Sequence, residues 1–129
     1  MDYGLLVMGA PYTSAAPHSA LRFANTLISK GHRLTGVFFY QDGVHNASLL
    51  MTPPQDELNL RDAWIALHQE HGVALDVCIA AALRRGLMSE AEAKRHGQAH
   101  FNVAEPFELT GLGQLLTLQQ RCDRLVTFA

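Results

Sequence analysis

Hydrophobic residues in this chain gather in short continuous runs that are separated by longer amphipathic stretches. One run, YGLLVMG, ends at a glycine, and another, RLTGVFFY, is rich in aromatic and branched residues. Continuous runs of this kind are typical of strands that are buried on both faces of a parallel sheet. The pattern predicts strands at residues 3–9, 33–40, 73–80 and 123–128.

Between these runs, apolar residues recur every three or four positions, as they do on one face of a helix. In the first such segment, Leu21, Ala24 and Leu27 share a face, and Gly31 supplies the end signal. A later segment opens at Ser89 with a glutamate three residues on, which is a capping-box pattern. Helices are predicted at residues 18–32, 59–72, 89–97 and 109–122, with a short stretch of helix-forming composition at 79–85.

The alternation of strands and helices predicts the architecture. We expect an α/β fold with one domain over residues 1–129, in which helices flank both faces of a mainly parallel, flavodoxin-like sheet. The connection 41–57 is long and has turn residues at Asp42-Gly43 and Pro53-Pro54. Because long connections in compact domains are often functional, this segment is a candidate for function.

Composition narrows the class of protein. Hydrophobic residues make up 48% of the chain and charged residues 17%, as in globular proteins. The net charge is −2 and no basic cluster exceeds Arg84-Arg85, so nothing predicts a nucleic-acid surface. Glycines and prolines break the uncharged stretch 3–21, which argues against a spanning helix. The Met1-Asp2 start lacks the basic residues of a signal peptide, so we expect a cytoplasmic protein.

The two cysteines occupy different ends of the predicted strands. Cys78 stands at the carboxyl end of the third strand, where sites gather in open parallel sheets. Cys122 comes just before the last strand, at the opposite end of the sheet. A disulfide needs Cα atoms within about 7 Å, so we expect no bridge and a packing role for Cys122.

Cys78 has two interpretations that the residues alone leave open. A free cysteine packs well as a small hydrophobe at a strand end. Alternatively, if a helical turn starts after it, unpaired N–H groups and the helix dipole favour a reactive thiolate. Arg84 and Arg85 lie one to two turns further on, so we do not expect them to help directly.

Other candidate motifs are weak. His68 with His71, and His96 with His100, have spacings that place two imidazoles on one helix face, but neither pair has a third ligand nearby. TGLGQLL lacks the third glycine of a dinucleotide fingerprint and is not predicted to follow a strand. Neither a phosphate loop nor a G-x-S-x-G elbow occurs. The Cys78 thiol is therefore the strongest chemical candidate.

Three stretches in register carry a family resemblance. FFYQDGVHNA (38–47), AWIALHQEHGVALDVCIAAALRRG (63–86) and ELTGLGQLLTLQQRCDRLVTF (108–128) together resemble the DsrE/TusD-like sulfurtransferase family. The resemblance implies a compact α/β fold and a sulfur relay for 2-thiolation of the tRNA wobble uridine. It also implies that Cys78, which matches the family's relay cysteine, carries sulfur as a persulfide without a metal or organic cofactor.

The resemblance further implies partners. Two homologous subunits, TusB and TusC, would join this chain in a paired heterotrimer, a heterohexamer. Sulfur would arrive from the carrier TusA and leave to TusE, so the chain itself would not bind tRNA tightly and would not bind a membrane. One departure is Tyr12-Thr13, where family members often have Tyr-Gly. His45 and Tyr12 are candidate neighbours of the thiol.

Three other functions remain as alternatives. The chain could be a DsrE-type sulfur carrier in dissimilatory sulfur oxidation. It could instead be a non-catalytic assembly subunit whose thiol is inert. A flavin- or nucleotide-binding module is allowed by the architecture alone, although fold does not imply function and no phosphate-cradling loop supports it.

Overall fold

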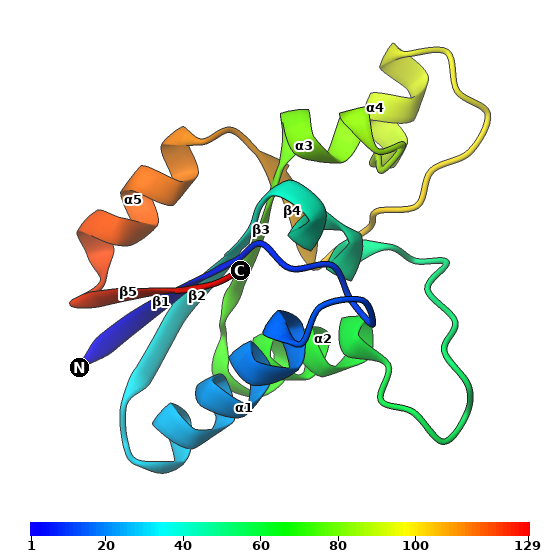
Figure 1. Ribbon diagram of the computed structural model, residues 1–129. Helices are drawn as coiled ribbons and strands as arrows, with labels where there is room; N and C mark the ends of the chain where they lie inside the picture. The colour runs from blue at the N-terminus through cyan, green and yellow to red at the C-terminus, as the bar shows by residue number, and fades with distance from the viewer.

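A five-stranded sheet runs through the centre of the computed structural model, which describes residues 1–129 (Figure 1). The elements in chain order are β1 (Asp2–Val7), α1 (Ala16–Ser29), β2 (Arg33–Phe39), the 3-10 helix η1 (Gln41–Ala47), α2 (Leu60–His71), β3 (Ala74–Cys78), α3 (Ile79–Arg84), α4 (Glu90–Arg95), β4 (Phe107–Thr110), α5 (Gly113–Arg121) and β5 (Arg124–Phe128). None of the helices is long and apolar enough to span a bilayer.

All neighbouring strands pair in parallel, in the order β4-β3-β2-β1-β5. The expected fold class, an α/β domain with a parallel sheet, is therefore confirmed. Within that class the strand order differs from the 2-1-3-4-5 order of flavodoxin itself. The chain builds outward from β1 through β2 and β3 to β4, and then returns to place β5 on the other side of β1.

Helices cover the two faces of the sheet unequally (Figure 1). The helices α1 and α2 pack side by side on one face, while α5 lies on the other, against β1 and β2. The α2 side holds large fully buried side chains, among them Trp64, whose ring meets that of Phe39 edge-on at 5.2 Å between centroids. On the opposite face, a Cβ at Gly4 or Gly36 would lie 3.0–3.3 Å from Leu118, so both glycines let α5 approach closely.

One local prediction was wrong and another was incomplete. The sequence pattern placed residues 109 and 110 at the start of a helix, but they end β4, and α5 begins at Gly113. The strand has only four residues and lies at the edge of the sheet, with alternating Phe107, Glu108, Leu109 and Thr110, so no continuous apolar run marks it. In addition, the first part of the long 41–57 connection folds as η1.

Candidate functional site around Cys78

Cys78 ends β3 and is the N-cap residue of α3. The helical turn on which the reactive interpretation depended does start directly after it. Its side chain makes no capping hydrogen bond, and only 2% of the residue is exposed. The thiol is thus at the expected edge of the sheet, but in the isolated chain it is closed off from solvent.

The pairing of β3 with the edge strand β4 places three polar side chains on the same face as the thiol. Cys78 is in register with Thr110, and Asp76 is in register with Glu108. Side chains at alternate positions of a strand share a face, and in-register residues of neighbouring strands do so as well. The intervening apolar residues point the other way, toward α2. The result is a two-by-two group of Cys78, Thr110, Asp76 and Glu108.

Asp76 is a buried carboxyl group, with only 8% of the residue exposed. Burial raises its pKa from 3.8 to about 6, and the neighbouring Glu108 charge adds to the increase. Asp76 did not stand out as a candidate in the sequence. The alternation in ALDVC would have placed it on the face of Cys78, but its carboxylate neighbour lies on the strand that was not predicted.

Thr110 carries a buried hydroxyl group beside Cys78. Its Oγ1 atom has no hydrogen-bond partner, the Cys78 thiol included. Buried polar groups are nearly always paired, so an unpaired hydroxyl next to a thiol requires an explanation. Sequence reasoning missed this residue because it missed β4.

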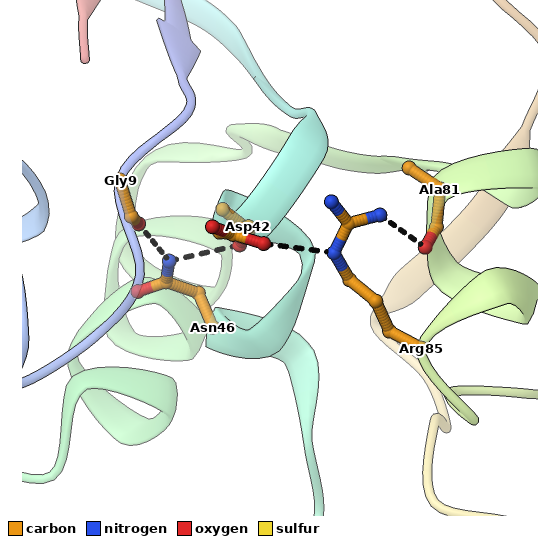
Figure 2. A network of polar contacts seen from close by, with 6 residues as sticks. Gly9, Asp42, Asn46, Ala81 and Arg85 are labelled. Carbon is orange, nitrogen blue, oxygen red and sulfur yellow. Dashed lines mark hydrogen bonds and ion pairs between the residues drawn. The ribbon is translucent and has the colours of Figure 1, made fainter.

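An ion pair ties α3 to η1 at the carboxyl edge of the sheet (Figure 2). Arg85 donates from Nε to Asp42 Oδ1 at 2.9 Å and from Nη1 to the Ala81 carbonyl at 3.0 Å. The two partners of the Arg85 guanidinium, the Asp42 carboxylate and the Ala81 carbonyl, hold α3 against η1.

Buried Asn46 joins η1, in which it lies, to two other segments at the same edge (Figure 2). Its Nδ2 donates to the carbonyls of Gly43 at 2.9 Å and Gly9 at 3.4 Å. Its Oδ1 accepts a hydrogen bond from Trp64 Nε1 at 3.2 Å. Asn46 thereby connects the loop after β1, the 3-10 helix η1 and the helix α2.

Tyr12 and His45 do not line a space with Cys78. Both border a surface cavity of about 620 Å³ between the β1–α1 loop and η1, and Cys78 is not among its lining residues. Tyr12 adopts a left-handed conformation with φ of 67°, and its hydroxyl donates to the Leu58 carbonyl at 2.7 Å. Thr13, at the departure from the family pattern, has no positive φ.

Cys122 lies away from this group. It caps the C-terminal end of α5, and a Cβ at Gly4 would come within 3.2 Å of its Sγ. Burial raises the pKa of its thiol, and the nearby Asp123 charge acts in the same direction. Both cysteines are free, as the sequence predicted, and the Cys122 surroundings are those of a packed side chain.

The histidine pairs and the TGLGQLL motif are the remaining candidates from the sequence. His68 Nδ1 lies 2.9 Å from the Val73 carbonyl, and His96 pairs with Glu92 at 3.3 Å. No three histidine, cysteine or carboxylate side chains gather as a metal site. The expectation that TGLGQLL follows no strand was wrong, because β4 runs directly into it, but the third glycine of a dinucleotide motif is still missing.

The chain is an α/β protein whose parallel sheet carries a cysteine at the carboxyl end of a strand. Comparison with known proteins shows which family it belongs to. The model of the DsrE/DsrF-like family matches residues 1–128. The chain belongs to this family.

Named relatives and a solved structure agree with this assignment. The chain is 48% identical over 128 residues to Sulfurtransferase TusD of Salmonella newport (strain SL254), covering 99% of this chain and 100% of the relative. Identity to Sulfurtransferase TusD of Salmonella arizonae is 47% over the same coverage. The crystal structure of the ychN protein from E. coli shares the fold, with a TM-score of 0.72, 19% identity and 99% of each chain covered. The expectation of a sulfurtransferase is confirmed, and with it a role in sulfur transfer.

Proposed function

We propose that this chain relays sulfur as a persulfide on Cys78. The observation that carries the proposal is the position of Cys78, at the carboxyl end of β3 and the start of α3, in a chain whose relatives are named sulfurtransferases. Ligand sites of open parallel sheets gather at this edge.

The chemistry needs one thiol and no redox partner. The Cys78 thiolate attacks the outer sulfur of a donor persulfide. The S–S bond of the donor breaks, a new S–S bond forms on Cys78, and the donor's inner sulfur leaves as a thiolate. A second cysteine within reach would discharge the persulfide as a disulfide. Cys122, packed beside Gly4 at the other end of the sheet, is not positioned to do so.

Burial of Cys78 makes movement of α3 part of this function. With 2% of the residue exposed, a donor reaches the thiol only when a segment around it moves aside, and α3, which starts directly after Cys78, is the segment that we propose to move. The helix α3 has six residues and is tied to η1 by the Arg85–Asp42 pair, whose carboxylate side chain is 63% exposed. Such a pair contributes only about 0–1 kcal/mol, so docking of a donor protein can displace it.

The finer proposal concerns the pathway. The sulfur comes from TusA, leaves to TusE and serves 2-thiolation of the tRNA wobble uridine in the cytoplasm. The chain acts within a heterohexamer with TusB and TusC homologues. A net charge of −2 is consistent with delivery of sulfur to another protein rather than tight binding of tRNA. Co-expression with TusB and TusC homologues, followed by sizing of the complex, tests the assembly.

The first test maps the sulfur. The purified chain, alone and with its partner subunits, is incubated with a cysteine desulfurase, cysteine and TusA, and then alkylated and analysed by peptide mass spectrometry. We expect the mass of one sulfur on the Cys78 peptide, absent in Cys78→Ser and unchanged in the matched control Cys122→Ser. The Cys78→Ser variant should keep its fold and assembly, because serine is close in size to cysteine.

One observation favours a second candidate, a non-catalytic assembly subunit. The near-complete burial of Cys78 is also what an inert packed thiol would show. Sulfur on neither cysteine in the assembled complex, together with slow alkylation of Cys78, would select this candidate. Sulfur on Cys78 without transfer to TusE would instead point to a carrier in dissimilatory sulfur oxidation.

A further inference from the structure

We propose that the Thr110 hydroxyl binds the carried sulfur by donating a hydrogen bond to the outer sulfur of the Cys78 persulfide. This inference rests on the proposed function of Cys78. In this inference a residue of β4, the strand next to β3, recognises the persulfide form of Cys78 rather than the free thiol.

The sheet itself brings the two residues together. Cys78 and Thr110 are in-register partners at the carboxyl ends of β3 and β4. Neighbouring strands lie about 4.8 Å apart, and in-register side chains project from the same face. Thr110 is therefore the residue of β4 placed beside the thiol.

The hydroxyl of Thr110 lacks a partner in the unloaded chain. Its Oγ1 is buried, and neither a backbone group nor the Cys78 thiol accepts its proton. A persulfide extends the side chain by one S–S bond, about 2.05 Å, beyond Sγ. The added sulfur carries the negative charge, and hydrogen bonds to charged groups are stronger than neutral ones. Loading thus supplies an acceptor where the structure has an unused donor.

The transfer step stays balanced with this contact in place. The Cys78 thiolate forms the new S–S bond, the donor's inner sulfur leaves as a thiolate, and the outer sulfur keeps its electron pair and charge. Thr110 keeps its proton throughout. It lowers the free energy of the persulfide relative to the free thiolate, and so favours retention of the sulfur until the acceptor arrives.

The test compares the loading equilibrium of matched variants, all in a Cys122→Ser background. Each is mixed with persulfide-loaded TusA and free TusA at fixed ratios, and loaded Cys78 is quantified by alkylation and mass spectrometry. We expect Thr110→Val to lower the ratio of loaded to free Cys78 roughly tenfold. Thr110→Ser, which keeps the hydroxyl, should restore most of it.

Thr35→Val is the control, because the Thr35 Oγ1 is also buried without a partner but lies on β2, five residues before the position beside Cys78. It should load like the parent chain. The ultraviolet titration of the Cys78 thiolate, taken as a difference from Cys78→Ser, should be the same in Thr110→Val and the parent, since the contact exists only in the loaded state. Should Thr110→Val fail to fold, Thr110→Ala against Thr110→Ser makes the same comparison.

Loading of Thr110→Val equal to that of Thr35→Val would overturn the inference while leaving the relay role of Cys78 intact. A loading deficit that Thr110→Ser does not rescue, or one accompanied by a shifted thiol titration, would overturn it in favour of a packing role. If the parent chain itself takes no sulfur at any ratio, the proposed function fails. That outcome is distinct from a loading deficit confined to the Thr110 variants.

Discussion

Asp76 shows how one side chain can oppose the stability of the sheet that holds it. It faces the same side as Cys78, next to Glu108 on β4, and burial of the residue raises its pKa to about 6. The group around Asp76 contains no cation, and no hydrogen bond to the Asp76 carboxyl compensates for its burial. Its ionised form is therefore disfavoured in the folded chain.

Replacement of Asp76 by asparagine should stabilise the chain in a pH-dependent way. The native pKa of about 6 lies above the ordinary 3.8, so between those values the folded state holds a proton that the unfolded state has lost. Stability contributed by the protonated form is present below pH 4 and is lost as pH rises to 6. At pH 7, Asp76→Asn should raise the free energy of unfolding by roughly 1–2 kcal/mol, after a discount for solvent screening.

Urea unfolding of both proteins at several pH values measures this difference. The stability gain should shrink toward zero near pH 4. Asp56→Asn, at an exposed loop position, is the control and should change stability little at any pH. A stability gain from Asp76→Asn that is equal at pH 4 and pH 7 would contradict the conclusion that burial disfavours the ionised Asp76 carboxyl.

At the scale of elements, Asn46 connects the segments that meet at the carboxyl edge of the sheet. The 3-10 helix η1, the loop after β1 and the helix α2 share few backbone hydrogen bonds, and the Asn46 side chain supplies the links among them. The residue is fully buried, so its amide could not remain there without these partners. The same edge carries the Arg85–Asp42 pair that holds α3.

Asn46→Ala should therefore lower the free energy of unfolding by about 2 kcal/mol. It removes three hydrogen bonds and leaves the Trp64 indole N–H buried without an acceptor. Denaturant unfolding followed by tryptophan fluorescence reports both the stability and the Trp64 surroundings. The control is Asn25→Ala on the exposed side of α1, where the loss should stay within about 0.5 kcal/mol. Equal losses in the two variants would refute the role given to Asn46.

At the scale of the whole molecule, the sheet separates the two cysteines. Cys122 packs beside Gly4, which is in register with Gly36 and through it with Ala74 at the start of β3. Cys78 is four residues further along β3, which amounts to about 13 Å at 3.3 Å per residue. A disulfide needs Cα atoms within about 7 Å, so the folded chain keeps the thiols apart.

Mild oxidation of the folded monomer should consequently give no Cys78–Cys122 disulfide. Non-reducing peptide mapping after treatment with oxidised glutathione measures this, with the urea-unfolded chain as the control in which the bridge can form. Mixed disulfides with glutathione are compatible with the structure. A linked Cys78–Cys122 peptide from the native monomer would show that the two ends of the sheet come together in solution.

Much of this organisation follows from local pattern. The continuous apolar runs correctly predicted β1, β2, β3 and β5, and Gly31 and Ser89 correctly predicted helix boundaries, because these signals depend only on nearby residues. The edge strand β4 escaped prediction because its four residues alternate and merge with the helix that follows. Without β4, neither Glu108 nor Thr110 could be placed beside the residues of β3.

The α/β class, the family, and the position of Cys78 at a strand's carboxyl end could all be inferred from patterns and motifs that are continuous along the chain. The burial of Cys78, the location of Tyr12 and His45 in a different cavity, and the placement of Asp76 and Thr110 on the face of the thiol became known only from the folded chain. These last relations depend on which strands become neighbours and in what register. Cys78 and Thr110, 32 positions apart, meet through backbone pairing and packing, and no local pattern encodes that.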